Sequence, residues 1–234
     1  MKYKKVVEGL FINRPNRFVA IVLIDGVKET VHVRNTGRCR ELLTPYAKVL
    51  MEDCSHNKNR KTKYSIIAVW KEDILINMDS QIPNKVVFDA LNEGVVSSFP
   101  NLSKLKREST FKNSRFDLFF ENGREKGFIE VKGVTLEKDG IAMFPDAPTG
   151  RGRKHVLEMI DAVKEGYSGA IFFLVQMKGP HIFKLNSEMD PEFSEAVKLA
   201  YKNGVDIIAY DSIVSTNDIV IGDKLEVDLA ILSS

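Results

Sequence analysis

The stretch Ser114–Leu136, SRFDLFFENGREKGFIEVKGVTL, contains two segments of alternating character on either side of a turn sequence. The turn is Asn122-Gly123, a strong β-hairpin signal because both residues tolerate the positive φ angles of a type I′ turn. A two-residue turn at these positions predicts that Glu121 pairs with Arg124. We therefore expect an antiparallel hairpin at the centre of the fold.

The predicted register places three charged residues on one face of this hairpin. With the two-residue turn, Asp117 lies opposite Phe128, and side chains two residues apart point to the same face. Asp117, Glu130 and Lys132 therefore share a face. The two carboxylates become diagonal neighbours, roughly 7–8 Å apart at the backbone, so that both reach one metal ion. A three-residue loop with a bulge would change the alternation, so the prediction depends on the turn.

The 234-residue chain is long enough for one large or two modest domains, and its composition is ordinary for a soluble globular protein. It has no run of about 18 apolar residues, and its first residues contain no apolar segment typical of a secretion signal. We therefore expect a cytoplasmic protein without membrane association. Cys39 and Cys54 form no Cys-x-x-Cys pair, and we expect both to be reduced.

The net charge of +2 is unevenly distributed along the chain. Residues 1–82 contain 15 Lys and Arg against 9 Asp and Glu, a net charge of +6, so residues 83–234 have a net charge of −4. A basic part beside an acidic part suits a polyanion-binding module joined to a cation-binding one. Scattered surface charge is the alternative explanation.

Residues 1–82 are predicted to form an N-terminal domain, a small OB-like β-barrel. The expected strands are Val6–Asn13, Phe18–Ile24, Glu29–Arg34, Lys48–Asp53, Tyr64–Trp70 and Ile74–Asn77. Five or six short strands with this spacing favour a small closed barrel. Such barrels commonly bind nucleic acid through basic and aromatic side chains on one face. The candidate contacts are Arg14, Arg17, Phe18, Arg34, Arg38 and Arg40. The alternative is that the arginines are solvated loop charges and that Phe18 belongs to the core.

Residues 83–234 are predicted to form an α/β domain with a mixed sheet. Besides the hairpin, we expect helices at Asn84–Val96, Arg153–Gly166 and Pro191–Asn203, and strands at Lys106–Lys112, Ala170–Gln176 and Val205–Tyr210. The alternation of strands and helices after the hairpin implies parallel pairing. The segment Met143–Gly152, with two prolines and two glycines, is expected to be irregular.

Asp117, Glu130 and Lys132 have the spacing of a divalent-metal site for phosphodiester hydrolysis. Mg²⁺ (or Mn²⁺) takes one or two protein carboxylates and keeps several waters, and the Val131 carbonyl is a further oxygen within reach. Lys132 is expected to orient or deprotonate the attacking water, or to stabilise charge on the phosphate. This Asp…Glu-x-Lys pattern across a hairpin is the signature of the PD-(D/E)XK nuclease fold. The alternative is an exposed strand face on which these charges pair with one another.

Other charged residues near the hairpin are weaker candidates. Glu93, on the helix before the hairpin, is a further candidate metal ligand, with a surface glutamate as the alternative. Arg151 and Lys154, near the start of the following helix, are candidate phosphate contacts. His155 is expected to pack or to bind backbone rather than to transfer protons.

Several segments together resemble the sugar fermentation stimulation protein (SfsA) family of bacteria and archaea. They are Asn35-Thr36-Gly37, Ile76-Asn77 through Pro83-Asn84-Lys85, Glu108 with Ser114–Asp117, Phe128–Leu136, Phe144–Ala147, Thr149–His155 and Val205–Tyr210. The resemblance covers nearly the whole chain. It implies an OB-like domain, a PD-(D/E)XK-like domain and binding of DNA with little sequence preference. It also implies that Asp117, Glu130 and Lys132 are the nuclease-like triad.

The sequence thus predicts a DNA-binding protein, with double-stranded DNA as the expected partner, that carries a nuclease-type metal site. The main alternative is a non-catalytic DNA-binding regulator, with a role in sugar metabolism implied by the resemblance alone. A third possibility is a module that binds small molecules or proteins and no nucleic acid. The sequence contains no signal for the oligomeric state.

Overall fold

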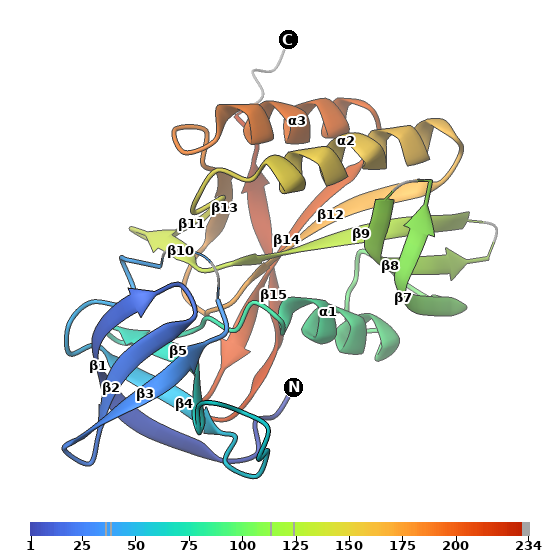
Figure 1. Cartoon of the computed structure of the whole chain (residues 1–234). Coiled ribbons are helices and arrows are strands. Elements are labelled where there is room, and N and C mark those ends of the chain that lie inside the picture. Colours follow the sequence, from blue (N-terminus) through green and yellow to red (C-terminus); the bar gives the residue numbers. More distant parts are fainter. Residues whose placement is uncertain (36, 38, 113, 124, 231–234) are drawn as a thin grey trace.

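The computed structural model describes residues 1–35, 37, 39–112, 114–123 and 125–230. The chain forms an N-terminal β-barrel beside a larger mixed sheet that carries helices on both faces (Figure 1). Helices α2 and α3 cover one face of the large sheet, and α1 lies on the opposite face. The described part of the chain has no helix that is both long and apolar enough to cross a bilayer.

The barrel is built from short strands whose side chains alternate between core and solvent. Its strands are β1 (Val6–Asn16), β2 (Val19–Ile24), β3 (Val27–Val33), β4 (Lys48–Asp53), β5 (Tyr64–Lys71) and β6 (Ile74–Asn77). They are ordered β3-β2-β1-β4-β5-β6, and a parallel pairing of β3 with β5 closes the barrel. In β2, Ala20, Val22 and Ile24 are buried while the residues between them are half-buried. The predicted small closed barrel is confirmed.

The C-terminal sheet is mixed, as predicted. Its strands are β7 (Lys104–Phe111), β8 (Ser114–Asn122), β9 (Glu125–Val134), β10 (Leu136–Lys138), β11 (Ile141–Phe144), β12 (Ser168–Val175), β13 (Ile182–Leu185), β14 (Asp206–Val214) and β15 (Ile219–Asp228). Their order is β10-β11-β13-β15-β14-β12-β9-β8-β7. Strand β12 runs parallel to both β9 and β14, which confirms the parallel pairing expected from the alternation of strands and helices.

The three helices α1 (Pro83–Asn92), α2 (Gly150–Lys164) and α3 (Pro191–Lys202) begin at local signals in the sequence. The Thr149 hydroxyl caps α2, the Asp190 carboxylate caps α3, and proline begins α1 and α3. The helix predicted from Arg153 starts earlier, inside the segment expected to be irregular, because Thr149 accepts a hydrogen bond from the Gly152 N–H.

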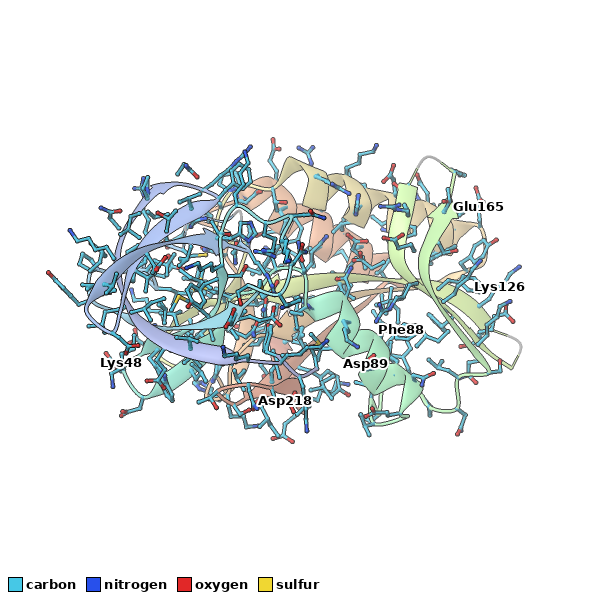
Figure 2. All side chains as sticks on the ribbon, turned by 60° about the horizontal axis from the view of Figure 1, so that its bottom comes forward. Lys48, Phe88, Asp89, Lys126, Glu165 and Asp218 are labelled. Atoms are coloured by element: carbon cyan, nitrogen blue, oxygen red, sulfur yellow. The ribbon has the colours of Figure 1, made fainter. Side chains whose placement is uncertain are left out.

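Helix α1 is shorter than predicted and packs against a neighbouring strand of the sheet. It ends at Asn92, whereas the predicted helix extended to Val96, and Val95 is 57% exposed. Phe88 and Asp89 lie on the side of α1 toward β7 and β8 (Figure 2), where the Arg107 guanidinium is 4.4 Å from the centre of the Phe88 ring. These contacts fix α1 against β7, with its N-terminus at the junction with the barrel.

The hairpin between β8 and β9 forms with a register that differs from the prediction by two positions. Glu121 pairs with Lys126 and Asn122 with Glu125, so Asn122 belongs to the strand and not to the turn. Gly123 supplies the positive φ, at +59°. Arg124, the predicted partner of Glu121, lies outside the described residues. A shift of two residues preserves the face to which each side chain points.

A buried polar joint connects the barrel to the C-terminal sheet. The side chain of Gln176, just after β12, donates to the Asn77 Oδ1 atom at 3.0 Å. The Arg34 guanidinium of the barrel contacts Asp79 at 2.9 Å and Glu52 at 2.5 Å. Apolar clusters also run from barrel strands into the C-terminal sheet, so the two parts share a core.

Replacing Arg34 with Ala is expected to lower the free energy of unfolding by about 3 kcal/mol, because the Asp79 side chain is fully buried and would lose its cationic partner. Urea unfolding of both proteins measures this cost. Lys104→Ala breaks an exposed pair with Glu121 and should cost less than about 1 kcal/mol. Equal costs for the two variants would contradict a structural role for the joint.

A second link between the two parts should make stability depend on pH. Burial raises the pKa of Glu137, but hydrogen bonds from Lys71 and from the Gly140 N–H outweigh it and hold the pKa below its usual value. The ionised carboxylate therefore stabilises the fold at neutral pH, and this contribution is lost as the pH falls through the lowered pKa. Glu137→Gln should reduce the unfolding free energy more at about pH 7 than at about pH 3. Equal reductions of the unfolding free energy at the two pH values, measured by urea unfolding, would contradict this prediction.

Candidate metal and catalytic site

The predicted triad lines a polar pocket of about 270 Å³ where β8 separates from β9. The ladder between these strands ends at the pair Leu118–Ile129. If this register is continued by one position, Asp117 lies directly opposite Glu130. The two residues are therefore closer to each other than in the diagonal arrangement predicted from the sequence. The starts of α1 and α2 and residue Glu108 of β7 also line the pocket.

Glu130 is a buried carboxylate with one oxygen held by two side chains. Its Oε1 atom lies 2.5 Å from the Lys132 Nζ atom and 2.5 Å from the His155 Nδ1 atom. Its Oε2 atom is buried and has no hydrogen-bond partner among the described residues. Burial raises the pKa of Glu130, but the hydrogen bond from His155 and the charge of Lys132 outweigh burial and lower it. The side chain is therefore ionised at neutral pH, with one oxygen left without a partner.

Asp117 lies beside Glu130, and where the ladder ends its carboxylate accepts a hydrogen bond from a backbone N–H of β9. Its Oδ2 atom accepts from the Val131 N–H at 2.8 Å, and its Oδ1 atom accepts from the Asn84 side chain at 2.6 Å. Burial, followed by the negative charge of Glu130, raises the pKa of Asp117. Since the N–H and C=O of a strand residue point the same way, the Val131 carbonyl also faces β8.

These oxygens fit a small divalent cation. The unpartnered Glu130 oxygen, the adjacent Asp117 carboxylate and the Val131 carbonyl are all hard donors of the kind that Mg²⁺ prefers. No group of three or more His, Cys, Asp or Glu side chains within the described ranges has a metal-binding arrangement. A site with two carboxylates therefore suits an ion that keeps several waters better than it suits structural zinc.

The other predicted site residues of the C-terminal part divide into two groups. Arg151 lines the pocket, and Lys154 is exposed on the same helix with its Nζ atom 3.7 Å from Glu158. Glu93 follows the last turn of α1, nine residues from Asn84, which places it about 13 Å along the helix from the pocket. The structure therefore does not bring Glu93 to the site.

Several of the predicted nucleic-acid contacts of the barrel lie around the loop between β1 and β2. The Arg14 guanidinium donates to the carbonyls of Gly37, Arg17 and Asn35, so it holds this loop to the segment after β3. The Arg17 guanidinium lies 4.7 Å from the centre of the ring of Phe18, which is 47% exposed. Arg38 lies outside the described residues. Nucleic-acid contact by these residues stays a prediction.

Two partners of the triad and one further residue that lines the pocket were not among the site residues predicted from the sequence. Asn84 and His155 bind the two carboxylates directly, whereas His155 was expected to pack or to bind backbone. Glu108 lines the pocket from β7, and the register of its neighbours places it level with Asp117. All three lie in the segments that carry the family resemblance, which was the available signal.

Comparison with known proteins confirms that resemblance. The family model described as the sugar fermentation stimulation protein RE domain matches residues 81–218, and the SfsA N-terminal OB domain matches residues 12–78. A homolog from Alkaliphilus oremlandii is 63% identical over 232 residues, covering 97% of this chain and 99% of that protein. A homolog from Clostridium beijerinckii is 49% identical over 229 residues, covering 98% of this chain and 100% of that protein.

A solved structure is similar over almost the same length. Pyrococcus furiosus SfsA in complex with Ca²⁺ is 26% identical and superposes with a TM-score of 0.88, covering 97% of this chain and 98% of that one. The match extends over both the barrel and the C-terminal sheet. Two family models and full-length relatives thus agree, and the chain belongs to the sugar fermentation stimulation protein (SfsA) family.

Proposed function

We propose that this protein binds DNA with little sequence preference and hydrolyses its phosphodiester bonds at a Mg²⁺ or Mn²⁺ site formed by Asp117 and Glu130. The observation that carries the proposal is the buried Glu130 Oε2 atom, which has no partner among the described residues and lies beside Asp117 in a polar pocket. An unpaired anionic oxygen in such a place is costly without a cation. The Ca²⁺ complex of the Pyrococcus furiosus relative supports a divalent ion.

The residues around the two carboxylates suit phosphate chemistry. A bound Mg²⁺ would neutralise charge on the phosphate and promote ionisation of a water nucleophile. Lys132, whose side chain is 15% exposed, places a positive charge in the same pocket. Arg151 and Gly152 of the first turn of α2 line the pocket, where the arginine charge and the positive end of the helix dipole suit a phosphate oxygen.

The barrel supplies the expected DNA contact. Its net positive charge would attract the phosphate backbone without reading the sequence. The exposed ring of Phe18 beside Arg17 suits stacking on a base. Binding should therefore weaken steeply as the salt concentration rises.

The test is to incubate the purified protein with plasmid, linear duplex, single-stranded DNA and RNA, in the presence of Mg²⁺, Mn²⁺ or EDTA. We expect cleavage of DNA with either metal, no cleavage in EDTA, and recovery when Mg²⁺ is added in excess. DNA binding without cleavage under every condition would favour the non-catalytic regulator. Absence of DNA binding at low salt would favour a module that does not act on nucleic acid.

A further inference from the structure

A second pocket, of about 330 Å³, lies between the barrel and the segment Phe144–Thr149 that leads from β11 into α2. We call it the junction pocket. The barrel contributes Asn35 and Gly37 to its lining. Thr135 and Gln176 line it from the carboxyl ends of β9 and β12, the edge of an α/β sheet at which ligands commonly bind.

The lining of the junction pocket combines flat apolar surfaces with hydrogen-bonding groups. Phe144, Pro145 and Pro148 supply the apolar part, and the amides of Asn35 and Gln176 lie among them. The charged side chain in the described lining is the Asp146 carboxylate, and no Lys or Arg belongs to that described lining. These groups disfavour an anion and favour a flat, neutral ligand that presents N–H donors.

Asp146 is placed to accept such donors. Burial has the largest effect on its carboxylate and outweighs the backbone N–H groups of Asp146 and Ala147, which lower the pKa. Burial raises its pKa, so an N–H donor from a ligand would stabilise the ionised form. Carboxylates accept base amino groups in this way in nucleic-acid complexes.

The junction pocket adjoins the pocket of the two catalytic carboxylates. Thr149 lines both pockets, and Gly133 of the junction pocket directly follows Lys132. Thr149 is held in place, since its N–H donates to Asp190 at 2.8 Å and its hydroxyl accepts from the Gly152 N–H at 3.2 Å. A nucleotide that occupied both pockets would therefore pass Thr149.

We infer that the junction pocket binds the base of an unpaired nucleotide whose phosphate lies between Asp117, Glu130 and Lys132. The inference rests on the proposed function and specifies its substrate. Each DNA base carries an N–H group on its Watson–Crick edge, so a single carboxylate accepts from any of them, in keeping with little sequence preference. That edge is free only in single-stranded DNA or in a nucleotide flipped out of a duplex.

The test measures ligand binding by the full-length protein in EDTA, which removes divalent metal and so prevents hydrolysis. The probes are the four deoxynucleosides, a monosaccharide, a single-stranded oligonucleotide, a paired duplex and a duplex with one mismatch. The readout is the NMR signals of the Ala147 and Thr135 methyl groups. We expect saturable shifts with the nucleosides and the single strand. Asp146→Asn should weaken nucleoside binding about tenfold, the effect of one charge-assisted hydrogen bond.

The matched control is Asp161→Asn, which removes an exposed charge of α2 outside the described lining of both pockets. It should leave nucleoside binding unchanged, and the spectra of both variants report whether they are folded. Shifts with the mismatched but not the paired duplex would support a flipped base. Shifts with the single strand alone would support a single-stranded substrate.

Three outcomes would overturn the inference. They are shifts with the monosaccharide and none with nucleosides, no shift with any probe, and equal nucleoside affinity in wild type and Asp146→Asn. The proposed function fails separately. If the protein binds nucleosides but cleaves no nucleic acid, the catalytic proposal is wrong and the assignment of the junction pocket to a base still holds. If it cleaves DNA but shows no methyl shifts with any probe, only the assignment of the junction pocket is wrong.

Discussion

Replacing Glu130 with Gln should lower the rate of DNA cleavage by about 10³-fold or more. The change removes a charge worth several kcal/mol to a bound divalent ion and its phosphate, and about 1.4 kcal/mol corresponds to a factor of ten. Gln is nearly the same size, so the buried side chain still fits. The measurement is the single-turnover cleavage rate with Mg²⁺ at neutral pH, where the wild-type side chain is ionised.

Glu137→Gln is the matched control, because Glu137 is also a buried glutamate of the C-terminal sheet that binds a lysine. It lies outside the pocket lining described for the carboxylates, so its cleavage rate should stay close to that of the wild type. If Glu130→Gln cuts as fast as this control, the nuclease site lies elsewhere or the activity belongs to a contaminant.

Lys132→Met should lower the cleavage rate by about 10²-fold, within the usual range for a group that transfers or orients a proton. Methionine preserves much of the side-chain volume and removes the charge. The wild-type Nζ atom lies 2.5 Å from Glu130 Oε1, and His155 binds the same oxygen. His155 should therefore still orient Glu130 in the variant, so Mn²⁺ affinity should change far less than the rate.

Lys126→Met is the corresponding control on the same strand, because the ammonium group of Lys126 lies over the Tyr167 ring outside the described pocket lining. It should cut at nearly the wild-type rate. A loss of Mn²⁺ affinity in Lys132→Met as large as its loss of rate would show that Lys132 acts through Glu130 and not on the substrate.

The sequence was sufficient to predict that Asp117, Glu130 and Lys132 share a face. The face to which a side chain points changes only when the register shifts by an odd number of residues. The predicted pairing register was wrong by two positions, yet an even shift leaves alternate side chains on the same face. The barrel strands Lys48–Asp53 and Ile74–Asn77 were predicted with the observed bounds. Local alternation and turn residues are sufficient for such elements.

What could not be predicted depends on how distant elements pack. Asn84 meets Asp117 because α1 packs against the hairpin, and His155 meets Glu130 because α2 lies over β9. Neither pairing leaves a periodic pattern in the sequence. Strand β15 was missed for a related reason, since glycine and charged residues interrupt its apolar alternation and its pairing with β13 and β14 supplies the order.

Asp117 and Glu130 are proposed to hold a divalent cation. A crystal soaked in Mn²⁺ and measured for anomalous scattering tests this proposal most directly, because the signal locates the ion independently of any activity. We expect a peak bounded by Asp117, Glu130 Oε2 and the Val131 carbonyl, which disappears in Glu130→Gln. A crystal that binds Mn²⁺ elsewhere and shows no peak between these two carboxylates would contradict the proposal.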